Sequence, residues 1–89
     1  MIRVAGDSMH GAGINDGDLV LVDRAITPVH GHVVIAVVGD EFVCRRLFRD
    51  GRDVRLQAIG GGGADIDVDE GHAVQIWGVV TQVIHTMPH

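Results

Sequence analysis

Short runs of β-branched and aliphatic residues, each bounded by turn-forming residues, dominate this chain. Residues 19–23 read Leu-Val-Leu-Val-Asp, and residues 33–38 read Val-Val-Ile-Ala-Val-Val. Apolar runs of this length between turn signals predict strands that are buried on both faces. No segment of helical length carries apolar residues at a 3.6-residue period, so we expect little helix. The chain is therefore predicted to fold as a mainly β protein.

The segment after the second run predicts consecutive antiparallel strands. Gly39-Asp40 is expected to turn the chain, and residues 41–48 continue as a strand. Asp50-Gly51 predicts a second turn, after which residues 53–59 alternate apolar and polar side chains. This order is typical of a β-meander.

A last strand is predicted over residues 74–86, with Gly78 inside it. A glycine within a strand indicates a bulge or the close approach of another backbone. Before this strand, Gly60-Gly61-Gly62-Gly63 predicts a flexible loop, because glycine loses the most backbone entropy on ordering.

The length of the chain fits one domain over residues 1–89. A domain of this size buries only about 60–65 % of its unfolded surface, so its stability is expected to be modest and dimerisation would add to it. The sequence has no apolar run near the length of a membrane span and no basic leader before a hydrophobic stretch. We therefore expect a cytoplasmic protein without membrane contact.

The formal net charge of −5 argues against direct binding to nucleic acid, because such binding depends on basic side chains that neutralise phosphates. Four arginines do cluster, at Arg45, Arg46, Arg49 and Arg52. They are interpreted as a solvated hairpin end or, alternatively, as a contact patch for an acidic partner. The single cysteine, Cys44, cannot form an internal disulfide and is expected to be buried in a strand.

No cofactor or metal site is predicted. His30 and His32 lie two residues apart and would face the same side of an extended chain, but two ligands do not complete a metal site. The segment Asn15-Asp16-Gly17-Asp18 lacks the spaced acidic ligands of a calcium loop and is explained as a turn.

The segment Gly6-Asp7-Ser8-Met9 contains the candidate nucleophile, Ser8. This segment resembles the serine motif of the self-cleaving peptidase domains of the LexA and UmuD family. The resemblance is carried by Val4-Ala5-Gly6-Asp7-Ser8-Met9, Gly13-Ile14-Asn15-Asp16-Gly17-Asp18-Leu19-Val20-Leu21-Val22-Asp23, His30-Gly31-His32-Val33-Val34-Ile35-Ala36 and Ile76-Trp77-Gly78-Val79-Val80. It implies the coiled, mostly β fold of those domains, with a last strand that helps to form a dimer.

The resemblance also identifies a departure from the family. In that family a neutral lysine activates the serine, and the matching stretch here is Phe42-Val43-Cys44-Arg45-Arg46-Leu47, which places Arg45 at the lysine position. The chain contains no lysine at all. At pH 7 an arginine side chain is neutral in roughly one part in 10⁵ or less, a handicap of about 7 kcal/mol or more for proton abstraction. We therefore expect self-cleavage to be absent or very weak.

The scissile Ala-Gly or Cys-Gly arm of the family lies well upstream of the serine, and the sequence begins seven residues before Ser8. The chain is therefore expected to resemble the processed form, UmuD′: a noncleaving, dimeric subunit that regulates a translesion DNA polymerase in the SOS response. Its expected partners are a second copy, a Y-family polymerase subunit and the RecA filament.

Two alternatives remain open. The first is the dimerising half of a LexA-like or phage-type repressor, whose helix-turn-helix would lie outside this chain. The second is a residual serine hydrolase that uses Ser8 with a substitute base, for which His10, His30 and His32 are the candidates.

Overall fold

The computed structural model describes residues 2–4, 9–60, 64–68 and 73–85. Within them, seven strands form one sheet, and the only helical element is the short 3₁₀ helix η1 (His10–Ala12). The strands are β1 (Ile2–Arg3), β2 (Leu19–Asp23), β3 (Val33–Val38), β4 (Glu41–Asp50), β5 (Asp53–Gln57), β6 (Ile66–Asp67) and β7 (Val74–Ile84). The predicted mainly β fold with little helix is confirmed. No helix in the described ranges is long and apolar enough to cross a bilayer.

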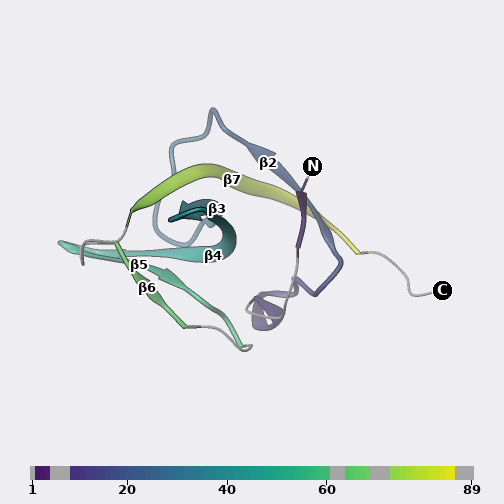
Figure 1. The fold of residues 1–89 in the computed structure, drawn as a ribbon, viewed down its shortest axis with the longest axis horizontal. Helices are drawn as coiled ribbons and strands as arrows, with labels where there is room; N and C mark the ends of the chain where they lie inside the picture. Colours follow the sequence, from purple (N-terminus) through teal and green to yellow (C-terminus); the bar gives the residue numbers. More distant parts are fainter. Residues whose placement is uncertain (1, 5–8, 61–63, 69–72, 86–89) are drawn as a thin grey trace.

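The strands follow the order β1-β2-β7-β3-β4-β5-β6, and neighbouring strands are antiparallel. The consecutive strands β3, β4, β5 and β6 form the predicted meander. Strand β7 lies between β2 and β3, and Figure 1 shows it passing beside both across the molecule. Strand β7 therefore joins the β1–β2 part of the sheet to the part formed by β3, β4, β5 and β6.

The boundaries of the meander differ from the prediction by a few residues. Strand β4 continues to Asp50 because Asp50 pairs with Asp53 and closes the hairpin, and Gly51 takes the positive φ of 60° that the turn requires. Strand β5 ends at Gln57, before the predicted end at residue 59. The predicted glycine loop lies outside the described residues except for Gly60.

The core consists of two clusters that meet at β3. Ile35 belongs to the cluster that contains Val4, Met9, Ile14, Val20 and Cys44. Val34 and Ala36 belong to the cluster that contains Leu47, Leu56 and Val79. Because successive side chains of a strand point to opposite faces, β3 is buried on both faces, as predicted.

The same prediction is wrong for β2. Only Val20 is fully buried, whereas Leu21 and Val22 are partly exposed. Val20 and Val22 contact the first cluster, but Leu21 is in neither cluster. The strand therefore packs against the core through one face.

Gly78 has both features that its place in a strand predicted. Ile35 pairs with Gly78 and Ala36 pairs with Ile76, which leaves Trp77 as the extra residue of a bulge. A Cβ atom at Gly78 would collide with the side chain of Val22 and lie 3.2 Å from the carbonyl oxygen of Asp23. A side chain at position 78 would force the Val22 side chain or the backbone of β2 to shift, because β2 approaches β7 so closely.

Candidate functional site

Strand β4 carries the predicted site residue Arg45 and changes partner along its length. Residues 41–46 pair with β3, and residues 46–50 pair with β5 on the opposite edge. Among the described strands, none pairs with the other edge of residues 41–45. This edge of β4 therefore borders the candidate site.

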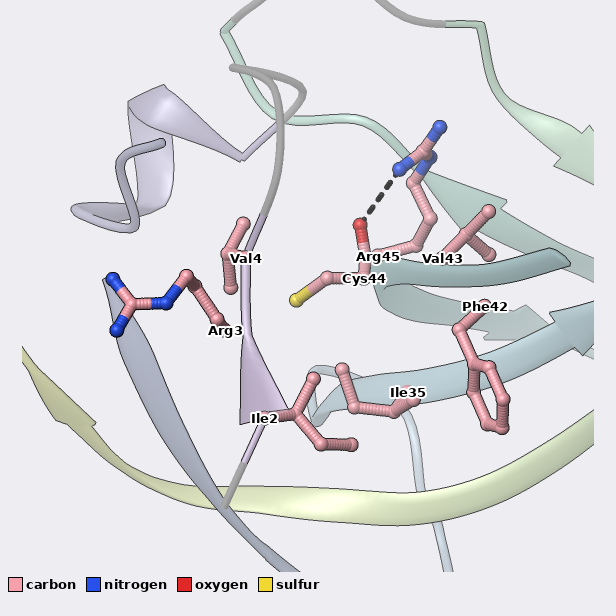
Figure 2. Close-up of a pocket in the computed structure, with 8 residues that line it drawn as sticks. All are labelled: Ile2, Arg3, Val4, Ile35, Phe42, Val43, Cys44 and Arg45. Carbon is pink, nitrogen blue, oxygen red and sulfur yellow. Dashed lines mark hydrogen bonds between the residues drawn. The ribbon is translucent and has the colours of Figure 1, made fainter. Parts of the chain in front are cut away.

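A pocket of about 220 Å³ opens beside this edge, between β1 and β4. Figure 2 shows its lining, which is Ile2, Arg3, Val4, Ile35, Phe42, Val43, Cys44 and Arg45. Most of these side chains are apolar, and the two arginines contribute positive charge at its margins. The pocket therefore suits an apolar group better than a highly polar one.

Arg45 folds back along its own strand. It is half-buried, and Nη1 donates a hydrogen bond to the carbonyl oxygen of Cys44 at 2.8 Å. A guanidinium group has donors only and cannot accept a proton from a hydroxyl group. In the geometry observed, the Arg45 guanidinium thus binds a backbone acceptor and offers no base.

Of the predicted serine motif, the structure describes only Met9, because Gly6, Asp7 and Ser8 lie outside the described residues. Met9 is 1 % exposed and packs in the first core cluster, which also contains Val4 and Cys44. Val4, which precedes the motif, and Met9, its last residue, therefore belong to the same core cluster as Cys44. The catalytic roles of Ser8 and Arg45 remain predictions.

Cys44 is buried, as expected, and its thiol is free. Burial raises the pKa of this thiol to about 11, although the charge of Arg45 acts in the opposite direction. Because the thiolate is the nucleophilic form of cysteine, Cys44 is poorly suited to covalent chemistry near neutral pH.

Phe42, which lines the pocket, also belongs to an aromatic pair that sequence reasoning missed. The rings of Phe42 and Trp77 meet edge to face with centroids 6.0 Å apart, and Phe42 is 60 % exposed. The guanidinium carbon of Arg24 lies 4.5 Å from the centroid of the Trp77 ring, and Nε of Arg24 donates to the carbonyl oxygen of Trp77 at 3.0 Å. The glycine after Trp77 was the available signal, since it marks the bulge that carries the indole.

Two of the three histidines proposed as substitute bases, His30 and His32, lie outside the pocket. Nδ1 of His30 accepts a hydrogen bond from the backbone of Arg49, and Nδ1 of His32 accepts one from the backbone of Val29. Neither histidine lines the pocket. In the part of the chain that the structure describes, no group of three or more His, Cys, Asp or Glu residues could hold a metal ion.

Comparison with known proteins gives a family match over nearly the whole chain. The family model described as "Peptidase S24-like" matches residues 1–81. Protein MucA of Salmonella typhimurium is 35 % identical over 91 residues, which cover 98 % of this chain and 60 % of MucA. Protein ImpA of Salmonella typhimurium is 39 % identical over 84 residues, which cover 94 % of this chain and 57 % of ImpA.

A LexA repressor is also similar. That of Psychromonas ingrahamii is 38 % identical over 87 residues, which cover 97 % of this chain and 42 % of the repressor. The chain thus spans 57–60 % of the length of MucA and ImpA, and less of this LexA repressor.

Proposed function

The chain belongs to the S24-like peptidase family, and on that premise we propose that it is a noncleaving, UmuD′-like subunit that dimerises and regulates a translesion DNA polymerase. The observation that carries the proposal is Arg45 at the expected position of the catalytic lysine. Serine chemistry needs a group that takes the hydroxyl proton, and lysine can do so when burial lowers its pKa. Arg45 instead donates to the carbonyl oxygen of Cys44.

The charge of the chain supports protein partners over nucleic acid. A net charge of −5 disfavours a phosphate-binding surface, whereas it is compatible with a protein interface. The proposed partners are a second copy of the chain, a Y-family polymerase subunit and the RecA filament, all in the cytoplasm. Failure of the purified protein to associate with any cognate Y-family subunit in a pull-down would contradict this assignment.

Restoring the missing base tests the catalytic part of the proposal. The unaltered protein and the Arg45→Lys variant would each be mixed with a catalytically inactive family member that carries the Ala-Gly arm. We expect the unaltered protein not to cleave this substrate in trans, because the Arg45 guanidinium cannot act as a base for Ser8. Cleavage by the unaltered protein would overturn the noncleaving assignment.

Two controls assign any cleavage to the restored pair. Arg46→Lys introduces the same side chain at the next position of β4, where the residue is exposed, and should not cleave. Adding Ser8→Ala to Arg45→Lys should abolish any activity of the single variant. If Arg45→Lys is itself inactive, the site has lost more than its base or no longer docks the arm.

The similarity to LexA repressors favours a second candidate, the dimerising half of a repressor. It predicts a reading frame in which a helix-turn-helix domain precedes this domain. It also predicts operator binding by that longer protein. A genomic sequence without such a domain would exclude this candidate.

A further inference from the structure

The connection from β2 to β3 ends in a tight turn at residues 29–32. The backbone N–H of His32 donates to the carbonyl oxygen of Val29 at 3.1 Å, and Gly31 has a φ of 92°. A positive φ at the third residue is the mark of a type II turn. Two backbone bonds of 2.8 Å attach the turn to β4, from Gly31 N–H to Leu47 O and from Leu47 N–H to His32 O.

Two further bonds hold this turn, and both have an imidazole nitrogen as the acceptor. Nδ1 of His32 accepts from the N–H of Val29 at 3.1 Å. Nδ1 of His30 accepts from the N–H of Arg49 on β4 at 3.0 Å. The first bond closes the turn on itself, and the second attaches its outer side to β4.

Both bonds require neutral rings. A neutral imidazole has one nitrogen that accepts and one that donates, whereas a protonated imidazole has two donors. Rotation of a protonated ring cannot restore an acceptor, because neither nitrogen has a free lone pair. Protonation of His30 or His32 therefore breaks its bond to the backbone and places two N–H groups against each other.

Charged side chains of both signs lie on the strands next to the turn. The His30 ring meets Phe48 edge to face at 5.4 Å, and the guanidinium carbon of Arg55 on β5 lies 4.8 Å from the centroid of the same Phe48 ring. Arg55 is paired with Asp53 at 2.7 Å, and β4 adds Arg46 and Arg49 beside the turn. Asp65 and Asp67 also act on Arg55, so the acid sensitivity rests on the two imidazole acceptors and not on these charges.

We propose that His30 and His32 form an acid-sensitive latch, which holds the 29–32 turn closed on β4 when both rings are neutral and releases it when they are protonated. The backbone bonds between the turn and Leu47 do not involve the imidazoles and remain. Release is therefore confined to the outer side of the turn, at the amides of Val29 and Arg49. The latch acts on the strand that carries Arg45, at the end that pairs with β5.

Amide hydrogen exchange by NMR tests the latch one bond at a time. Protection factors, corrected for the intrinsic effect of pH on exchange, would be measured at pH 8 and pH 5. We expect protection of the Val29 and Arg49 amides to fall about five- to tenfold at pH 5, the factor that corresponds to one net hydrogen bond. Protection at Leu47 and at Ile35 in the core is expected to stay unchanged.

A variant that keeps the acceptors but cannot titrate provides the matched control. In His30→Asn/His32→Asn the amide oxygen Oδ1 can occupy the place of Nδ1, so protection of both amides should no longer depend on pH. Unchanged protection of Val29 and Arg49 in the unaltered protein would overturn the latch. An equal pH-dependent loss in the asparagine variant, or a loss at every amide, would overturn it as well, because either result shows a general loosening.

Discussion

Nδ1 of His85 lies 2.8 Å from Oδ2 of Asp18, a residue 67 positions earlier in the chain that is only 3 % exposed. The same Oδ2 accepts the backbone N–H of Asn15 at 2.8 Å. The contact closes the end of the β2–β7 ladder, where Leu19 pairs with Ile84. A histidine that follows the last strand is thus tied to the turn that precedes β2.

Asp18 and His85 should contribute unequally to the stability of the folded protein. Asp18→Ala removes a buried acceptor and leaves its donors without a partner, so we expect a loss of about 2–3 kcal/mol in the free energy of unfolding. His85→Ala should cost less than about 1 kcal/mol, because the side chain of His85 is 59 % exposed and water can replace it. Urea unfolding at pH 7 measures both values. Equal losses in the free energy of unfolding would show that the Asp18 carboxylate stabilises the protein only through its contact with His85.

The Cys44 thiol should make stability fall at alkaline pH. Burial raises its pKa from 9.0 to about 11, so the folded state favours the protonated thiol. This contribution is fully present below pH 9 and is lost as the pH rises toward 11, with a size of about 2–3 kcal/mol. The chain has no tyrosine and no lysine, and arginine titrates only above this range. Denaturant unfolding at pH 8 to 11 should therefore show a decline that Cys44→Ala removes.

The same thiol should react slowly in the folded protein. At pH 8 a pKa of about 11 leaves roughly a hundredfold less thiolate than in the unfolded chain. Labelling with an aromatic disulfide reagent should thus be about a hundredfold slower in buffer than in urea. Equal rates in the two solvents would show that the thiol is accessible and ionised.

Gly78→Ala should lower the free energy of unfolding more than Gly39→Ala does. Its Cβ would meet the side chain of Val22 and the backbone of Asp23, so we expect a cost of about 2–4 kcal/mol. Gly39→Ala is the matched control, since nothing lies within 4 Å of its Cβ. It should cost only about 1–2 kcal/mol, for the positive φ of 61°. Thermal unfolding compares the two, and a smaller loss for Gly78→Ala would contradict the close approach of β2.

Arg24→Gln should change the fluorescence of the protein and leave its stability nearly intact. Trp77 is the sole tryptophan, and the Arg24 guanidinium lies over its ring. We expect a shift of the emission maximum and a loss of at most about 1 kcal/mol. Arg55→Gln removes the comparable cation over Phe48 and should leave the emission unchanged. An unchanged spectrum in Arg24→Gln would show that the cation does not occupy the ring face in solution.

Much of the fold was predictable because its signals are local. The runs at residues 19–23 and 33–38 specified strands, and the Asp50-Gly51 turn specified a hairpin, since chain reversal depends on the residues at the turn. The resemblance to the LexA and UmuD family was also local, and the match of the S24-like family to residues 1–81 confirmed it. The resemblance also predicts that Arg45 occupies the lysine position, and this assignment remains a prediction.

What could not be predicted depends on contacts between distant segments. Strand β7 pairs with β2 and β3, which lie far from it in the sequence, and no local sequence pattern specifies these pairings. The contact between Asp18 and His85 follows from these pairings, because β7 brings His85 beside Asp18.

The amino-acid sequence by itself determined the strands, the turns, the family and the absence of lysine, since each depends on residue type and on close neighbours along the chain. The tertiary structure alone decided that His30 and His32 accept backbone hydrogen bonds, because an acceptor's role depends on which donor the fold brings within about 3 Å. It likewise decided that the bulge at Trp77 meets Phe42 and Arg24. Packing across the sheet, which sequence spacing does not encode, sets these contacts.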